Sequence, residues 1–197
     1  MTRKYRRDWL SNGFDPSQQQ LWDLLVAVGF EGRTVLEIGC GVGYFHQRMV
    51  ADGAASAVGV DLSAAMLDEA RKLAEESGTA DRVRYHNGAY ADVAEQAGGA
   101  DITILDRVLC CDPRPDLLIG GSGPRTGSVF AVTYPHRNPL SRVGLALARV
   151  WFRLRGADFQ PYLHAPARLD GLITDAGLVL HAEARTWMWR SLVFVRR

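Results

Sequence analysis

The sequence predicts an α/β protein with a Rossmann-like, doubly wound and mostly parallel sheet of seven strands that ends in a C-terminal antiparallel hairpin. Three observations predict this fold. Strand-like apolar segments alternate with amphipathic, helix-like segments, a glycine-rich turn follows the first strand, and residues 178–197 contain two strand-like segments in succession. Alternation of this kind is typical of a parallel sheet with helices on both faces.

The first predicted elements surround the glycine-rich turn. Residues 17–29 carry apolar side chains at helical spacing, and the helix ends at Gly29. Residues 34–38 form a predicted buried strand, which is followed by a helix over 44–52 and a second strand over 56–60.

The middle of the chain continues this alternation. Ser63 is suited to cap a helix over 64–76, and Gly78 is suited to end it. Residues 82–86 and 101–106 are the third and fourth predicted strands.

The remaining elements complete the sheet. Pro113 can begin a short helix, and residues 128–134 form the fifth strand. Residues 139–155 place their apolar side chains on one helical face and their arginines elsewhere. A further helix covers 166–177, and the hairpin over 178–197 supplies the last two strands.

A length of 197 residues predicts one domain over 1–197. Within it we expect an N-terminal helical cap over 1–30 and a lid-like helical insertion over 137–166, which would cover the pocket of the substrate. An alternative is that the insertion only covers the sheet. The net charge of +1 provides no overall field that would attract nucleic acid or a membrane surface.

The cysteines, at positions 40, 110 and 111, are odd in number and include an adjacent pair, which does not fit a disulfide framework. No C-x-x-C spacing indicates zinc, and we predict no bound metal. We expect Cys110 and Cys111 to be small buried residues. The absence of a recognisable signal peptide or membrane span favours the cytoplasm.

The glycine-rich turn lies within residues 35–45, V-L-E-I-G-C-G-V-G-Y-F, with Gly39, Gly41 and Gly43 at alternate positions. Glycine permits left-handed backbone and lets a ligand approach the main chain. Counted from Gly39, the third glycine of a G-x-G-x-x-G dinucleotide motif would fall at Tyr44, so that motif is not met. A turn of this kind can also serve only to pack a helix against a strand.

An acid ends the second predicted strand at Asp61, about twenty residues after the turn, where a ribose is bound in dinucleotide folds. The two acceptor oxygens of a carboxylate suit the two hydroxyls of a ribose. The alternative is an ordinary acid ahead of the next helix.

Three segments in order, V-L-E-I-G-C-G-V-G, V-G-V-D-L-S-A-A-M-L-D-E-A-R and D-I-T-I-L-D, resemble the motifs of class I S-adenosylmethionine-dependent methyltransferases. Residues 105–113 and 134–167 are similar to magnesium-protoporphyrin O-methyltransferases, although those enzymes usually have a histidine where this chain has Cys111. The resemblance implies S-adenosyl-L-methionine as the cofactor.

Carried over by position, the resemblance implies a set of cofactor-binding residues in these motifs. Asp61 would hold the ribose, Leu62 and Met66 would pack near the adenine, and residues 87–90 would border the base. The implied cofactor-binding residues are Glu37, Gly39, Cys40, Gly41, Gly43, Asp61, Leu62, Met66, Asn87, Gly88, Ala89, Asp106 and Arg107.

Methylation of a hydroxyl can require a general base, whereas a carboxylate acceptor needs none. The candidate catalytic residues are His164, His136 and Tyr134. Their alternative roles are a helix entry for His164, an exposed turn for His136 and strand-end packing for Tyr134.

Transfer of a methyl group to a small-molecule acceptor, with an oxygen favoured, is therefore the predicted function. Alternatives are a non-methylating reaction of the same cofactor, such as a cyclisation, and an NAD(P)-dependent oxidoreductase. A nucleic-acid partner is not expected, because the chain lacks an N-P-P-Y motif after the fourth strand. We also expect no stable membrane insertion, and the sequence predicts no particular oligomeric state.

Overall fold

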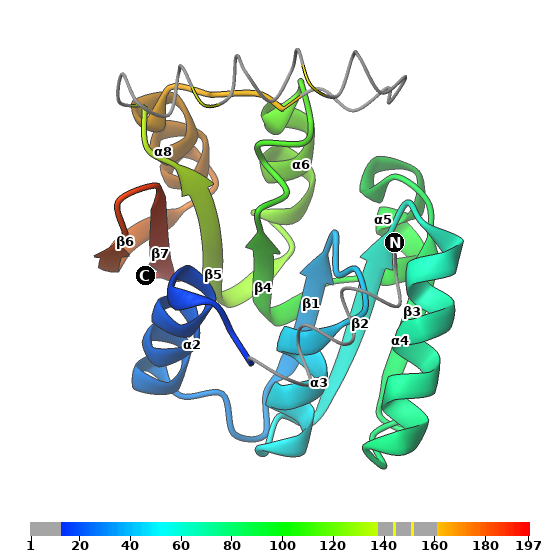
Figure 1. The fold of residues 1–197 in the computed structure, drawn as a ribbon. Helices are drawn as coiled ribbons and strands as arrows, with labels where there is room; N and C mark the ends of the chain where they lie inside the picture. Colours follow the sequence, from blue (N-terminus) through cyan, green and yellow to red (C-terminus); the bar gives the residue numbers. More distant parts are fainter. Residues whose placement is uncertain (1–12, 138–143, 145–150, 152–160) are drawn as a thin grey trace.

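The computed structural model describes residues 13–137, 144, 151 and 161–197 (Figure 1). The expected N-terminal cap over 1–30 therefore lies partly outside the described residues, and the expected lid over 137–166 lies mostly outside them. Both remain predictions.

The seven strands form one sheet in the order β3-β2-β1-β4-β5-β7-β6. The neighbouring strands β3, β2, β1, β4 and β5 pair in parallel, and β7 pairs antiparallel with both β5 and β6. This arrangement confirms the predicted sheet and hairpin. The strands are β1 (Thr34–Ile38), β2 (Ser56–Asp61), β3 (Val83–Asn87), β4 (Ala100–Asp106), β5 (Thr126–Pro135), β6 (Leu178–Arg185) and β7 (Trp189–Arg196).

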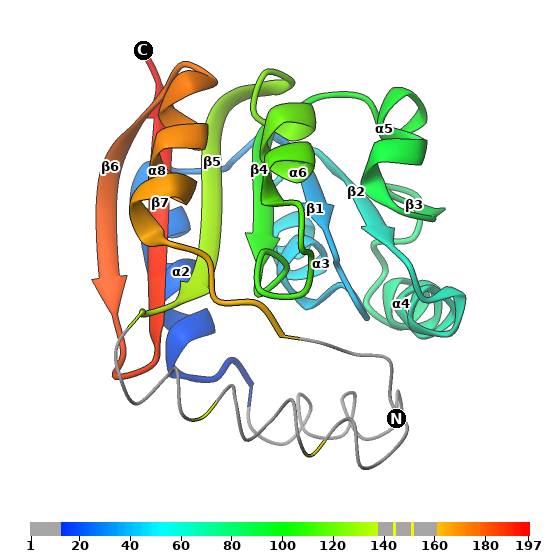
Figure 2. The same ribbon diagram turned by 90° about the horizontal axis from the view of Figure 1, so that it is seen from above.

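Helices cover both faces of the sheet (Figure 2). One face carries α5, α6 and α8, whose apolar residues join one core cluster, and the other carries α2, α3 and α4, whose residues join a second cluster. The helices are α2 (Pro16–Val28), α3 (Tyr44–Ala51), α4 (Ala64–Glu76), α5 (Tyr90–Ala97), α6 (Pro115–Ser122) and α8 (Pro166–Asp175).

Local signals explain where several helices begin. The Asp15 side chain accepts hydrogen bonds from the first turn of α2 and forms a capping box with Gln18. The Ser63 side chain accepts from the backbone N–H of Met66, as its sequence position predicts. By contrast, α5 was not predicted, and its N-cap residue Ala89 makes no side-chain hydrogen bond.

The strand order reverses between β1 and β4, and the carboxyl ends of β1, β2 and β4 lie at the same edge, at the top of the sheet in Figure 1. Ligands of doubly wound sheets bind at this switch point. No helix within the described part of the chain combines the length and apolar character needed to cross a bilayer.

Candidate active site

A pocket of about 260 Å³ opens at this switch point, and we call it the switch-point pocket. The turns after β1, β2, β3 and β4 form its walls, and α6 closes one side. The lining residues are Ile38, Gly39, Val60, Asp61, Leu62, Gly88, Ala89, Tyr90, Asp106, Arg107, Val108, Cys111, Asp112 and Leu118.

The glycine turn forms the wall after β1. Gly39 has φ +67°, and a Cβ atom built on it would lie 2.4 Å from Cγ2 of Val108, so only glycine fits there without displacement. The backbone N–H of Gly39 donates to the carbonyl of Val60 at 2.7 Å, which ties the turn to the end of β2. Gly43, at φ +80°, is the N-cap of α3.

The Asp61 carboxylate organises the wall after β2. Its Oδ2 accepts from the N–H of Gly41 at 2.7 Å, and its Oδ1 accepts from the N–H of Ser63 at 2.8 Å. Each oxygen keeps a further lone pair for a ligand. The next residue, Leu62, is 77% exposed although it is apolar, and Asn87 donates to the carbonyls of both Asp61 and Leu62.

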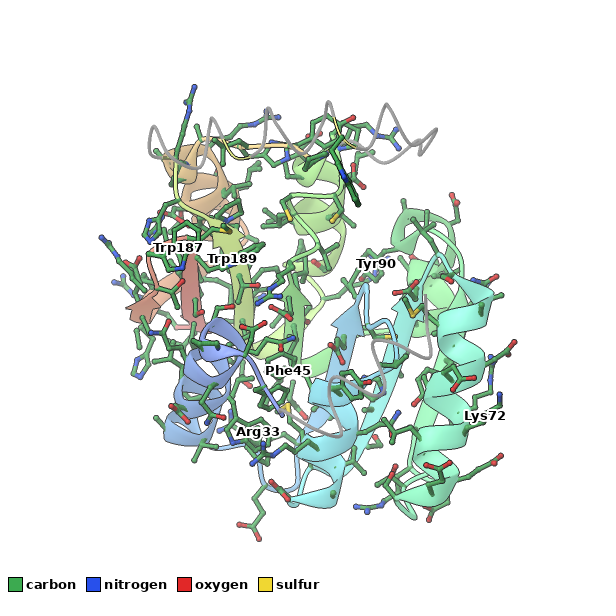
Figure 3. The ribbon with its side chains drawn as sticks, in the orientation of Figure 1. Arg33, Phe45, Lys72, Tyr90, Trp187 and Trp189 are labelled. Atoms are coloured by element: carbon green, nitrogen blue, oxygen red, sulfur yellow. The ribbon has the colours of Figure 1, made fainter. Side chains whose placement is uncertain are left out.

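Gly88, Ala89 and Tyr90 form the wall after β3. Gly88 has φ +149°. Tyr90 is the first residue of α5, and its side chain is labelled in Figure 3. Tyr90 is buried, and its hydroxyl has no hydrogen-bond partner among the described residues. Burial raises the pKa of this hydroxyl. The Tyr90 ring packs between α5 and α6, where its Cε1 lies 3.3 Å from a Cβ atom built on Gly121, so the hydroxyl is directed into the core and not into the pocket.

Asp106 is the last residue of β4 and lines the pocket. Its carboxylate accepts from Nε2 of Gln18 at 2.9 Å and from the hydroxyl of Thr133 at 2.5 Å. Burial raises the pKa of this carboxyl group, although Arg107 and the two donors oppose the shift.

Arg107 follows with φ +57°, the one non-glycine residue with positive φ in the described ranges. Its N–H donates to Thr133 at 2.7 Å, and its guanidinium pairs with Asp15 and lies over Trp189, 4.7 Å from the ring centroid. A non-glycine residue in this conformation is held by its surroundings, often beside a functional site. Helix α2 is thereby tied to the pocket rim through Asp15.

The loop after β4 brings two thiols to the pocket. The thiols of Cys110 and Cys111 each donate to the carbonyl of Arg107 at 3.2 Å, and their sulfur atoms are 3.8 Å apart. Cys111 is exposed and lines the pocket, which corrects the expectation that both cysteines are buried. The interaction between the two thiol groups lowers the pKa of Cys111.

His164 lies one contact away from the pocket. Its Nε2 donates to the carbonyl of Asp112, a lining residue, at 2.9 Å. Because a carbonyl only accepts, Nε2 carries the proton, and Nδ1 of a neutral ring has a free lone pair. The N–H of Tyr162 also donates to the carbonyl of Cys110 at 2.7 Å, so the segment before α8 braces the pocket loop.

The other two catalytic candidates lie elsewhere. Tyr134 is buried between β5 and α8, where its hydroxyl donates to Asp170 and accepts from Nη1 of Arg190. Burial raises the pKa of Tyr134. His136 lines a separate hollow, and its Nε2 donates to the carbonyl of Thr186 at 3.1 Å. The structure therefore does not bring the three candidates together.

Glu37 acts beneath the pocket instead of lining it. It is buried, and its carboxylate lies 2.5 Å from Nδ1 of His46 and accepts from the His46 N–H at 3.2 Å. The ring of His46 continues to the hydroxyl of Tyr85 at 3.2 Å. This buried network fixes the start of α3 behind the glycine turn.

About half of the predicted cofactor residues line the pocket. Those brought together are Gly39, Asp61, Leu62, Gly88, Ala89, Asp106 and Arg107. Those that do not line it are Glu37, Cys40, Gly41, Gly43, Met66 and Asn87. Sequence reasoning gave no pocket role to Val108, Cys111, Asp112 or Leu118, since their contribution depends on how the loop after β4 folds back. The described residues contain no group of three or more His, Cys, Asp or Glu side chains placed to hold a metal ion.

Residues 35–118 match the family described as "Methyltransferase domain". The chain is 31% identical over 157 residues to the ubiquinone biosynthesis O-methyltransferase of Psychrobacter arcticus, a match that covers 76% of this chain and 60% of that protein. It is 32% identical over 164 residues to the enzyme of the same name from Bordetella avium, covering 80% of this chain and 66% of the relative. The chain thus spans about three fifths of the length of the first of these relatives.

Solved structures share the fold. The magnesium protoporphyrin IX methyltransferase of Synechocystis, with bound SAH, superposes with a TM-score of 0.71 at 21% identity and covers 92% of this chain and 81% of its own. A putative S-adenosylmethionine-dependent methyltransferase of Listeria monocytogenes gives a TM-score of 0.75 at 18% identity, covering 92% and 98%. These two similarities concern the fold alone.

Proposed function

We propose that this chain, which belongs to the class I S-adenosylmethionine-dependent methyltransferases, transfers a methyl group from S-adenosyl-L-methionine to an oxygen of a small-molecule acceptor. The observation that carries the proposal is the glycine turn, which is hydrogen-bonded to the Asp61 carboxylate and forms one rim of the switch-point pocket together with it. We also propose that the chain acts in the cytoplasm, in keeping with its free cysteines, Cys40, Cys110 and Cys111.

The lining residues fit this cofactor. The free lone pairs of Asp61 suit the two ribose hydroxyls, and the exposed side chain of Leu62 suits one face of the adenine. Gly39 lets the methionine part lie against the backbone. Glu37 supports this wall from behind through His46.

When bound, the cofactor supplies a methyl group on a positively charged sulfur. The residues of this chain orient it by holding its sugar and backbone, and orientation of two reactants can lower a barrier by several kcal/mol, on the order of 7–11 in favourable cases. The apolar side chains of Ile38, Val60 and Leu118 exclude water from the same pocket.

His164 is our choice of general base among the three candidates. Its Nε2–H is committed to the carbonyl of Asp112, which orients the ring and leaves Nδ1 to accept the proton of an acceptor hydroxyl. Replacement by alanine should reduce kcat by about 10²–10⁴-fold. His164→Gln, whose amide can still donate to Asp112, should not restore kcat. A kcat within threefold of the wild type would remove His164 from this role.

The expected segments over 1–30 and 137–166 are proposed as a cap and as a lid over the acceptor. The tie from Asp15 to Arg107 supports the first, since it couples the start of α2 to the pocket rim. The contacts of Tyr162 and His164 with the pocket loop support the second.

The test combines binding with product analysis. Calorimetry with S-adenosylhomocysteine should show binding to the wild type, and Asp61→Ala should weaken it by about 10–100-fold, because hydrogen bonds to a charged group contribute about 1.5–3 kcal/mol. Asp81→Ala, at an exposed turn, is the matched control and should change nothing.

The enzyme is then incubated with labelled cofactor and a panel of phenols and acids. We expect a product that is heavier than its acceptor by one methyl group. A product of unchanged methyl content would favour the cyclisation alternative. Binding of NAD(P) in place of S-adenosylhomocysteine would favour an oxidoreductase.

A further inference from the structure

A second hollow, which we call the arginine pocket, lies at the end of β5. It has a volume of about 620 Å³ and is bounded by the start of α8 and the turn between β6 and β7. Its lining residues are His136, Arg137, Pro166, Arg185, Trp187 and Arg190.

The charges around the arginine pocket do not cancel. Arg185 and Arg190 share the carboxylate of Glu183, with both Nε atoms 2.6 Å from its Oε1, and Arg190 also lies 3.4 Å from the carboxylate of Asp170. Arg137 adds a third guanidinium. Among the residues that the structure describes, three positive charges against two negative ones leave one positive charge at the hollow.

Hydrogen-bond donors also remain. Within the described residues, Arg185 uses Nε and Nη2, and Arg190 uses Nε and Nη1. One amino group of each guanidinium is therefore left for a ligand. Guanidinium groups bind carboxylates in a planar, paired geometry.

An aromatic surface adjoins these donors. Trp187 is 68% exposed, and Figure 3 shows it beside Trp189, near the end of β5 and the start of β7. The Trp187 indole offers a flat apolar surface on which an aromatic ring can stack. The arginine pocket thus combines a cationic part and a flat apolar part.

Two connections join the arginine pocket to the switch-point pocket. Arg107 of the switch-point pocket lies over Trp189, which directly precedes Arg190 of the arginine pocket. The segment from His164, bonded to the pocket loop, to Pro166, which lines the arginine pocket, runs from one to the other.

We propose that the arginine pocket binds the carboxylate of an aromatic acceptor, whose ring lies on Trp187 while its hydroxyl reaches the switch-point pocket. This inference rests on the proposed function and specifies its substrate class. A monoanionic carboxylate matches the single unbalanced positive charge, whereas a phosphate dianion would lie close to Glu183 and Asp170 with excess negative charge.

The test uses ligands that cannot be methylated at a hydroxyl. Binding of 2-naphthoate, its neutral amide and 2-naphthyl phosphate is measured by calorimetry at low salt. We expect the naphthoate to bind at least tenfold more tightly than either of the other two. Arg185→Gln and Arg137→Gln should each weaken naphthoate binding about tenfold and leave the amide unchanged. Trp187→Ala should weaken both the acid and the amide.

Arg168→Gln is the matched control, because this exposed arginine of α8 pairs with Asp116 away from the arginine pocket. Melting temperatures establish that each variant is folded. Equal binding of acid and amide, tighter binding of the phosphate, or wild-type naphthoate affinity in both pocket arginine variants would overturn the proposal. Calorimetry with S-adenosylhomocysteine on the same samples separates this proposal from the proposed function. If the wild type did not bind S-adenosylhomocysteine, that result would count against the proposed function, whereas naphthoate binding tests the arginine pocket.

Discussion

Replacement of Gly39 by alanine should destabilise the protein through a defined overlap. The new Cβ would lie 2.4 Å from Cγ2 of Val108, whereas carbon atoms pack at about 3.5–4.0 Å. Forcing an extra methyl group into a packed region costs about 1–3 kcal/mol. Left-handed backbone adds about 1–2 kcal/mol for any residue that carries a Cβ.

Gly78 supplies the matched control. It has the same φ of +67°, but nothing lies within 4 Å of a Cβ built there. Gly78→Ala should therefore lose only the backbone part, and the difference between the two variants should be about 1–3 kcal/mol. For a chain of this size, that difference corresponds to about 2–12 °C in Tm.

The assay is thermal unfolding without ligand, followed by calorimetry with S-adenosylhomocysteine. In the double variant Gly39→Ala, Val108→Ala, the second substitution should remove the overlap. The loss of stability in the double variant should therefore be smaller than the sum of the losses in the two single variants. Equal losses of Tm in Gly39→Ala and Gly78→Ala, or strict additivity with Val108→Ala, would refute the reasoning.

Three further predictions concern polar side chains that are hydrogen-bonded or ion-paired. Glu37→Ala should lower the free energy of unfolding by about 1–3 kcal/mol, because the buried ring of His46 loses its partner, and chemical denaturation of Glu37→Ala against the exposed-site variant Asp81→Ala measures this. Tyr134→Phe should lower the free energy of unfolding by a similar amount and leave kcat nearly unchanged; a kcat reduced by a hundredfold would instead indicate a catalytic hydroxyl. The neighbouring guanidinium groups, first that of Arg185, lower the pKa of Glu183 from 4.5 to about 2, so its stabilising effect is complete above about pH 4.5 and is lost as the pH falls towards 2. Unfolding curves of Glu183→Gln should therefore change less over that range than those of the wild type, and parallel curves would contradict the assignment.

The fold could be predicted because its strongest signals are local. The cap at Ser63 and the apolar strands each depend on residues close in sequence, and both are confirmed. Helix α5 was missed because its eight residues follow an alanine that provides no capping group. The helix after β4 begins at Pro115, not at Pro113, for a similar reason, since its N-cap residue also lacks a side-chain bond.

The candidate site could be predicted only in part. The glycine turn and Asp61 lie on segments whose positions follow from the strand order. The loop after β4 was beyond prediction, because the backbone of Arg107 is held by Thr133 and its side chain by Asp15, both distant in sequence. That conformation brings Cys111 to the pocket.

The position of β7 determines how the last part of the chain can enter the sheet. β7 lies between β5 and β6, and β6 has no other strand beside it among those described. β6 is therefore joined to the rest of the sheet only through β7, although it comes earlier in the chain. Amide protons on β6 should consequently exchange with solvent no more slowly than those on β7, and any event that detaches β7 releases both strands together.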